Sequence, residues 1–187
     1  MLRLCYYEIS VLNLHLKLIL RVSSSKKGQV LIIQIYTDGS AKGNPGPGGY
    51  GIVMRYKGKE KEIAQGFRMT TNNRMELLAL IVALEHLKIE SIPVEVYSDS
   101  KYVIDSITKG WVFGWRTKGF KGKKNADLWM RYLNLHNRFK IQFHWVRGHN
   151  GHPENERCDV LAVNAADKGP HLVDEVFEKN QEIEKLL

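Results

Sequence analysis

Apolar and polar residues alternate along this 187-residue chain with two different periods, and each period predicts one kind of element. Short apolar runs bounded by glycine, asparagine or charged residues are typical of strands. They predict strands at residues 30–37, 49–56, 60–69, 94–98 and 140–146. Longer stretches with apolar residues on one or more faces are typical of helices. They predict helices at residues 74–88, 101–108, 126–139 and 156–169, and a helical turn at 111–115.

The order of these elements along the chain, βββαβααβα, predicts an α/β fold. The first three strands are joined by short turns, such as the one at residues 57–59, and we expect them to form an antiparallel meander. Helical crossovers lead to the two remaining strands. We therefore expect a five-stranded mixed sheet flanked by helices.

Residues 1–28 follow neither pattern clearly, and we interpret them as a poorly ordered N-terminal extension. Their leucine-rich stretch is interrupted by His15 and Lys17, so it is too polar and too short to span a bilayer. A signal peptide is disfavoured because no small-residue cleavage site follows, whereas a transit peptide or an overextended start stays open. We expect one globular domain at residues 29–169 and an acidic C-terminal tail at 170–187.

The chain is basic, with a formal net charge of +8 and a pI of about 9.4, which favours a polyanionic partner. Residues 101–124 hold seven Lys or Arg against one acidic residue, so a single segment carries most of the excess. The two cysteines, Cys5 and Cys158, give neither a disulfide framework nor a zinc-binding spacing. This predicts a reducing compartment and a cytoplasmic location.

Two acidic residues, Asp38 and Asp99, follow predicted strands in the similar sequences "YTDGS" and "YSDSK". If the first and fourth strands are parallel neighbours, the two carboxylates meet at one edge of the sheet. Two such charges about 4 Å apart repel by roughly 4 kcal/mol at an effective dielectric near 20. A proton or a cation must then reduce the repulsion. Each acid could instead cap the turn or helix that follows it, but the near-repeat favours a shared site.

Two further acids have both a structural and a functional interpretation. Glu76 is either a third oxygen ligand or the capping-box partner of Asn73 as helix N-cap. Asp159 is either a fourth ligand or an acid stabilised near a helix N-terminus. Because no Cys or His pattern accompanies them, these acids suit Mg²⁺ or Mn²⁺ better than zinc.

His149 lies in the glycine-rich sequence "RGHNGHPENE", which predicts a loop. A loop histidine that titrates near neutral pH suits proton transfer or departure of a leaving group. A zinc site with His144 and His152 is disfavoured, because His144 belongs to a predicted strand and no thiolate joins them.

Residues 110–125 interleave aromatic and basic side chains. Lysines neutralise phosphates and flat rings pack on sugars or bases, so this mixture is typical of a surface that follows a nucleic-acid backbone. The alternative is an exposed basic loop anchored by core aromatics. The polar run "TTNN" at 70–73 can donate to phosphates or read groove edges, or can simply cap the next helix.

Four motifs in this order resemble the type 1 ribonuclease H family in its bacterial form: "YTDGSAKGNPGPGGYG", "TTNNRMELLALIVALE", "VYSDSKYV" and "WVRGHNGHPENERCDVLA". The resemblance covers residues 30–168, which makes 29–169 the expected catalytic domain, with a ribonuclease H-like fold. It implies an endonuclease that hydrolyses the RNA strand of RNA–DNA hybrids and leaves 5′-phosphate and 3′-hydroxyl ends. It also implies two Mg²⁺ ions per site during catalysis, with Mn²⁺ as a substitute.

The resemblance assigns roles to individual residues. The carboxylates expected to bind metal are Asp38, Glu76, Asp99 and Asp159, with His149 as the flexible-loop histidine. The residues expected to contact nucleic acid are Asn44, Thr71, Asn72 and Asn73, Asn125 in a phosphate pocket, and Trp111, Trp115, Lys118, Lys121, Lys123 and Lys124 on a basic protrusion. We expect no membrane association and no obligatory protein partner. One domain suffices for the site, so we expect a monomer.

The chain departs from the family pattern in its basic protrusion, which is short because few residues separate Phe120 from Asp127. This leaves affinity and cleavage-site preference open. Three other functions match parts of the pattern. A non-catalytic hybrid-binding module would lack a carboxylate or the histidine, and an integrase or transposase core would lack "TTNN" and the aromatic–basic segment. A structural RNA-binding protein would need no acidic cluster.

Overall fold

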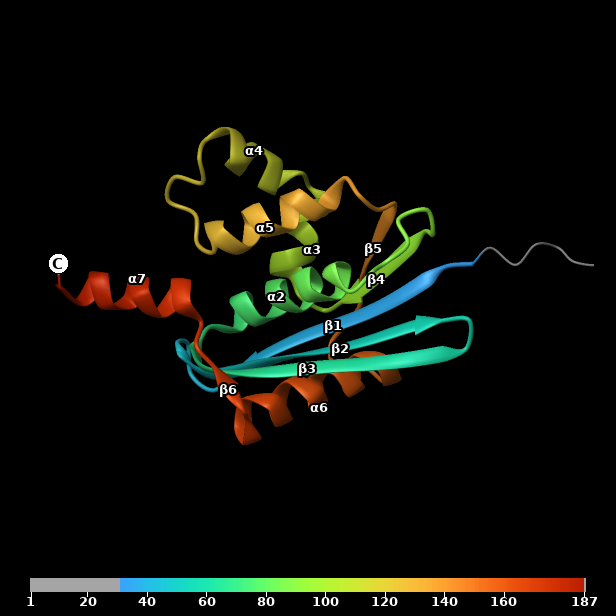
Figure 1. Cartoon of the computed structure of the whole chain (residues 1–187), viewed down its shortest axis with the longest axis horizontal. Coiled ribbons are helices and arrows are strands. Elements are labelled where there is room, and N and C mark those ends of the chain that lie inside the picture. Colours follow the sequence, from blue (N-terminus) through green and yellow to red (C-terminus); the bar gives the residue numbers. More distant parts are fainter. Residues whose placement is uncertain (1–30, 187) are drawn as a thin grey trace, which may run out of the picture. The chain divides into compact units, whose positions relative to one another are not determined.

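The computed structural model describes residues 31–186, and the predicted extension at 1–28 lies outside them (Figure 1). The described residues form one mixed sheet of six strands in the order β5-β4-β1-β2-β3-β6. The strands are β1 (Ile33–Ala41), β2 (Gly46–Tyr56), β3 (Lys59–Thr70), β4 (Val94–Ser98), β5 (Ile141–Trp145) and β6 (His171–Leu172). The helices are α2 (Asn72–Glu85), α3 (Lys101–Thr108), α4 (Trp111–Thr117), α5 (Ala126–His136), α6 (Pro153–Lys168) and α7 (Glu175–Leu186).

The predicted α/β fold with a mixed sheet is confirmed. Strands β1, β2 and β3 form the antiparallel meander, and β4 and β5 continue the sheet in parallel with β1. The sequence did not predict β6 and α7, which lie in the segment 170–187 expected as an acidic tail. Strand β6 has only two residues, which pair with Gly66 and Phe67 of β3, and such a short strand leaves no period in the sequence.

Strand β1 is longer than its apolar run, and this changes the position of Asp38. The strand continues to Ala41, and Asp38 pairs with Gly51 of β2. The prediction that Asp38 follows the end of its strand was therefore wrong. The antiparallel partner β2 begins at Gly46 and extends the ladder past the point where the parallel partner β4 ends.

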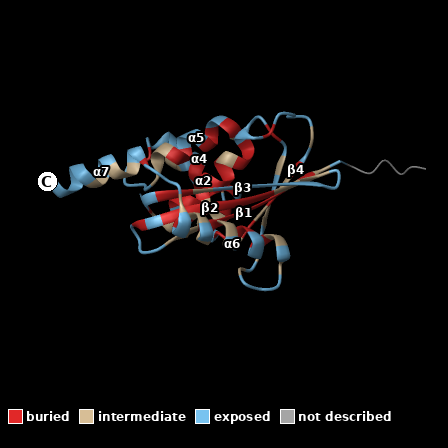
Figure 2. Cartoon of the chain, turned by 60° about the horizontal axis from the view of Figure 1, so that its bottom comes forward, coloured by how far each residue is buried: buried red, intermediate tan, exposed pale blue. Residues whose placement is uncertain are grey.

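The core lies between the sheet and α2, and Figure 2 shows these facing surfaces as the most deeply buried part of the molecule. Ile35 of β1 and Ile52 of β2 are completely shielded from solvent, as is Leu80 of α2. Burying one such side chain contributes about 1.5–3 kcal/mol to folding. Helix α2 is apolar around most of its circumference because α5 covers the side that faces away from the sheet (Figure 1).

Helix α6 covers the opposite face of the sheet (Figure 1) and approaches it almost backbone to backbone. A Cβ atom added at Gly51 would overlap the carbonyl oxygen of Cys158 and lie 2.8 Å from Cβ of Leu161. The strand glycines of the first motif thus let α6 dock without intervening side chains. This close approach fixes the distance between α6 and the strands β1 and β2. It thereby also fixes the position of the residues on the inner face of α6.

Within residues 31–186, none of the helices combines the length and the apolar character that crossing a bilayer requires.

We expect Gly51→Ala to lower the free energy of unfolding by about 1–3 kcal/mol, because the added methyl forces α6 away from the sheet. The matched control is Gly114→Ala in α4, where a Cβ would meet open space. There the change should be neutral or should stabilise by about 0.5–1 kcal/mol, since alanine is the better helix former. Urea unfolding followed by circular dichroism measures both. Equal stabilities of the two variants would contradict the close contact.

Candidate active site

Parallel pairing of β1 and β4 brings two of the predicted site acids together. The last residue pair of this ladder is Thr37 with Ser98, and Asp38 and Asp99 follow directly on the two strands. The condition set by the sequence, parallel neighbouring strands, is therefore met. Asp38 is buried, with 8% of its surface exposed, and Asp99 is half-buried.

The environment of Asp38 opposes its negative charge. Burial is the largest cause, and with the charge of Asp99 it raises the pKa of Asp38 to about 8. The backbone N–H of Gly39 donates to Asp38 Oδ1 at 2.7 Å and lowers the pKa, so the turn-capping interpretation holds in part. Asp159 and Glu76 raise the pKa further. All four predicted acids therefore act on one electrostatic site.

Glu76 belongs to this site and not to a helix cap. Helix α2 has Thr71 as its N-cap, so the capping-box alternative for Asn73 and Glu76 was wrong. The Glu76 carboxylate instead accepts hydrogen bonds from Nδ2 of Asn72 at 2.9 Å and Oγ of Ser100 at 2.5 Å. Burial and the charge of Asp99 outweigh these bonds and raise the pKa of Glu76 to about 7.

Asp99 does not cap a helix either. Ser100 is the N-cap of α3 and accepts a bond of 3.1 Å from the backbone of Val103, so the capping alternative for Asp99 was wrong. Asp99 Oδ2 accepts from Nδ2 of Asn155 at 3.2 Å. A Cβ at Gly148 would lie 2.5 Å from the same oxygen, so a larger residue there would have to displace the Asp99 carboxylate.

The loop that contacts Asp99 also carries His149. The histidine is exposed and adopts a left-handed backbone conformation with φ of 51°. Asp159 lies on α6, half-buried and beyond the first helical turn, where Glu154 and Glu156 are the acids. The helix dipole therefore gives Asp159 little stabilisation, because this effect fades within one turn.

The four acids share an electrostatic site without forming a closed set of ligands. Among residues 31–186, no three or more His, Cys, Asp or Glu side chains lie close enough together to form a metal-binding group as they stand. The donors are nevertheless all carboxylate oxygens, which suit hard divalent cations. Burial and neighbouring acids raise the pKa values of Asp38 and Glu76, so a bound cation would stabilise their ionised forms.

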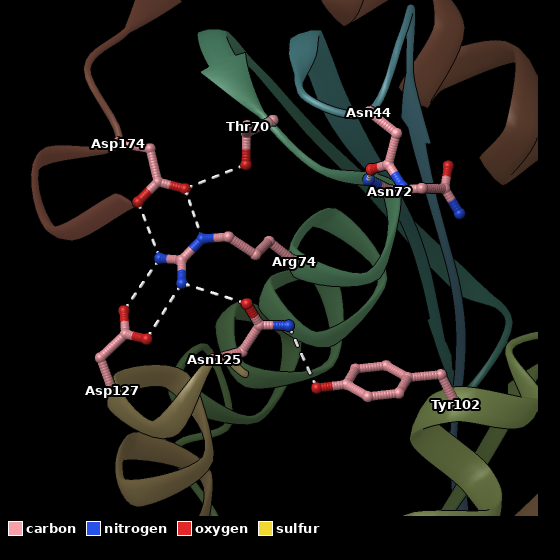
Figure 3. Close-up of polar contacts among 8 residues, drawn as sticks. All are labelled: Asn44, Thr70, Asn72, Arg74, Tyr102, Asn125, Asp127 and Asp174. Atoms are coloured by element: carbon pink, nitrogen blue, oxygen red, sulfur yellow. Dashed lines mark hydrogen bonds and ion pairs between the residues drawn. The ribbon is translucent and has the colours of Figure 1, made fainter. Parts of the chain in front are cut away.

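Six of the predicted nucleic-acid residues line a hollow of about 440 Å³ next to α2. Those that line it are Asn44, Thr71, Asn73, Lys123, Lys124 and Asn125, and residues of α7 form the other wall. Asn72 connects this hollow with the acids. Its backbone N–H donates to Asn44 Oδ1 at 3.3 Å, and Figure 3 shows the two residues side by side. Its side chain donates to Glu76 at 2.9 Å. The structure thus connects the two groups of predicted residues.

A second hollow, of about 340 Å³, shares Asn73, Lys123 and Lys124 with the first and is lined by Trp111 and Trp115. Nζ of Lys123 lies 5.1 Å above the ring of Trp115, so this aromatic and basic pair is in direct contact. Lys118 and Lys121 are exposed on the same segment but lie outside both hollows.

Sequence reasoning missed several residues that hold the site in place. Ser100 and Asn155 bind the acids, and Arg74 binds Asp127 and Asp174 beneath the first hollow (Figure 3). A signal for Arg74 existed, because a charged residue followed by an apolar helix is conspicuous in "TTNNRMELL". No comparable signal identified Asp174 as its partner.

Comparison with known proteins agrees with this arrangement. The RNase H family profile matches residues 31–167. The ribonuclease H of Desulforamulus reducens is 58% identical over 145 residues, which cover 75% of this chain and 90% of that protein. The crystal structure of LC9-RNase H1 has a TM-score of 0.65 and 32% identity over 75% of this chain and 74% of its own. LC11-RNase H1 in complex with an RNA/DNA hybrid has a TM-score of 0.54 and 30% identity over 73% and 97%.

The resemblance predicted from four motifs is thereby confirmed over nearly the same residues. From the profile match, the sequence identity and the shared fold we conclude that this chain belongs to the ribonuclease H family of enzymes.

Proposed function

We propose that this chain hydrolyses the RNA strand of RNA–DNA hybrids with two bound divalent cations, and that it leaves 5′-phosphate and 3′-hydroxyl ends. The observation that carries the proposal is the convergence of four acids, two with raised pKa values, beside a hollow lined by lysine and amide groups. The likeness to LC11-RNase H1, whose structure holds an RNA/DNA hybrid, supports the substrate class.

The donor set suits Mg²⁺, with Mn²⁺ as a substitute, and the residues that would hold the ions are Asp38, Glu76, Asp99 and Asp159. A closed protein cage is not required, because Mg²⁺ is commonly held by one or two carboxylates together with substrate phosphate and water. When bound, the ions would supply an activated water and stabilise the charge on the leaving oxygen.

The chain's own residues prepare this chemistry. Gly39 and Asn155 fix the orientations of Asp38 and Asp99 by hydrogen bonds, and Ser100 with Asn72 does the same for Glu76. Such partners matter because the position of a ligand carboxylate depends on the groups that hold its other lone pairs. His149, exposed on the loop that contacts Asp99, would exchange a proton with the substrate or help the product to depart.

Substrate binding would use both hollows. The hydroxyl and amide groups of Thr71, Asn73 and Asn125 would donate to phosphates, and Asn44 with Asn72 would face the groove of the hybrid. The rings of Trp111 and Trp115, together with Lys118, Lys121, Lys123 and Lys124, would follow the DNA strand. The 2′-hydroxyl distinguishes the RNA strand to be cleaved. Because one domain supplies every group, we propose that a monomer suffices, and a cytoplasmic location remains our expectation.

The decisive assay compares RNA–DNA, DNA–DNA and RNA–RNA duplexes of one sequence, with Mg²⁺ and with a chelator. We expect Mg²⁺-dependent cleavage of the RNA strand of the hybrid alone. Asp38→Asn should lower the rate about 10³-fold or more, because a weaker ion ligand removes several kcal/mol of charge stabilisation. Hybrid binding in chelator should stay within about twofold. Asp105→Asn, the same change at an ion pair of α3, is the control and should remain active. Full Mg²⁺-dependent activity of Asp38→Asn would sink the assignment.

The raised pKa of Asp38 predicts how stability depends on pH in chelator. A carboxyl with a pKa of about 8 in the folded protein and an ordinary value of 3.8 favours folding at low pH, and this contribution is lost as the pH rises towards 8. Asp38→Asn cannot ionise. It should therefore be more stable than the parent by several kcal/mol at pH 8, up to about 5 kcal/mol, and the gain should shrink towards pH 4. Urea unfolding at several pH values measures this. A gain independent of pH would contradict the proposed charge repulsion.

Replacing Lys121, Lys123 and Lys124 by alanine should weaken hybrid binding and reduce its salt dependence. Each phosphate that a lysine no longer neutralises lowers the slope of log K against log salt by roughly 0.7–0.9. The control removes the same charge from the far end of the sheet by replacing Lys57, Lys59 and Lys61, which are exposed around the β2–β3 turn. Equal slopes for the two triple variants would exclude the basic segment as a phosphate-binding surface.

A further inference from the structure

Resting on the function proposed above, we propose that Arg74 is a positioning residue for nucleic-acid binding. It holds the side-chain amide of Asn125 so that an N–H group, and not the carbonyl oxygen, faces the first hollow. Asp174, from the C-terminal segment, holds Arg74 in turn. The inference concerns Arg74 and Asp174, for which the proposed function itself provides no role.

The guanidinium of Arg74 is saturated with acceptors. Its side chain is buried, with 3% of the residue exposed, at the start of α2 and two residues before Glu76. Nε and Nη2 donate to Asp174 at 2.7 Å each, Nη1 and Nη2 donate to Asp127 at 3.0 and 2.8 Å, and Nη1 donates to Asn125 Oδ1 at 3.4 Å (Figure 3). A guanidinium has five N–H donors, so every donor has a partner and the group has one orientation.

This saturation decides the orientation of the Asn125 amide. A guanidinium has donors only, so the group of Asn125 that faces it must be the carbonyl oxygen. The amide nitrogen then points the other way, where it donates to the hydroxyl oxygen of Tyr102 at 3.1 Å (Figure 3). One N–H of the amide is used in this bond. Because Asn125 lines the first hollow, we infer that the second N–H is available to an acceptor there, such as a phosphate oxygen.

The backbone conformation of Asn125 also depends on its surroundings. Asn125 is the N-cap of α5 with φ of 61° and ψ of 33°, a left-handed conformation, and its side chain makes no capping bond to that helix. Non-glycine residues in this region are held there by their surroundings. Arg74 binds Asn125 and also Asp127 in the first turn of α5, so one guanidinium joins the starts of α2 and α5. These two helix starts carry Thr71, Asn73 and Asn125, which line the hollow.

Arg74 does not act by attracting phosphate. Its single positive charge faces the two carboxylates of Asp127 and Asp174, so the cluster has a net negative charge. Burial by itself would lower the pKa of the guanidinium, but bonds to Asp127 and Asp174 raise it overall, so Arg74 stays protonated. The attraction comes from Lys123 and Lys124 on the same hollow. The contribution of Arg74 is therefore geometric.

A double-mutant cycle tests this inference. Arg74→Lys keeps the charge but loses the planar fork, and Asn125→Ala removes the amide that the fork orients. Hybrid dissociation constants are measured by fluorescence anisotropy in chelator, and KM and kcat in Mg²⁺. We expect each single variant to raise Kd and KM by about tenfold with kcat within about threefold. The double variant should bind no more weakly than Asn125→Ala alone, because Arg74 acts through Asn125.

A second variant keeps the inference testable if Arg74→Lys does not fold. Asp174→Asn removes one negative charge near the hollow, so a purely electrostatic role predicts tighter hybrid binding. A positioning role predicts weaker binding, because Arg74 loses part of its support. Glu178→Gln is the matched control, since it breaks the exposed pair with Arg68 on the same C-terminal segment and leaves the Arg74 cluster intact. It should leave Kd unchanged.

Additive effects of Arg74→Lys and Asn125→Ala would overturn the inference, as would tighter binding by Asp174→Asn. A loss confined to kcat would also overturn it, because Arg74 would then act on Glu76 and not on the hollow. These results are distinct from failure of the proposed function, in which the parent protein itself would neither bind nor cleave the hybrid.

Discussion

The repulsion between Asp38 and Asp99 is the constraint on which the rest of the structure depends. Parallel pairing of β1 and β4 places the two carboxylates next to each other, and the burial of Asp38 limits the screening of its charge by water. A protein that needed only stability would avoid this arrangement, since it costs free energy whenever both groups are ionised. The surrounding sheet and helices are built to tolerate it. Burial of apolar side chains in the core offsets the free-energy cost of the repulsion. Hydrogen bonds from Gly39, Asn155 and Ser100 stabilise the acids directly.

Helices on the two faces of the sheet bring the other two acids to the site. On one face α2 is buried in the core and brings Glu76 to the site from a rigid helix. On the other face α6 docks through the strand glycines and brings Asp159. Four acids from separate parts of the chain therefore have their backbone positions fixed by core packing, and hydrogen bonds from Gly39, Asn155 and Ser100 orient three of their side chains. The site is consequently as precise as the packing of the two helices.

The sequence predicted the mixed sheet and the four acids because apolar periods and strand-end acids are local signals. It left the helix caps open, because Thr71 and Ser100 lie within one or two residues of Asn73 and Asp99 and only the helix geometry decides between them. It missed β6 and the partner of Arg74 for another reason. Asp174 is distant in sequence from Arg74, and the two-residue strand before it has no period to detect. Long-range polar pairs of this kind are set by tertiary structure alone.

The ion pair between Arg74 and Asp174 joins positions 100 residues apart in the chain. A loop that includes most of the domain must close before the pair can form, and such closure has a conformational entropy cost that local contacts do not offset. The pair is therefore a property of the completed fold and not of any one hairpin or helix. Fluctuations that open the C-terminal segment would disconnect the guanidinium while the sheet and its acids stay intact. If Arg74 has the positioning role proposed above, substrate binding and hydrolysis would depend on regions of different local stability.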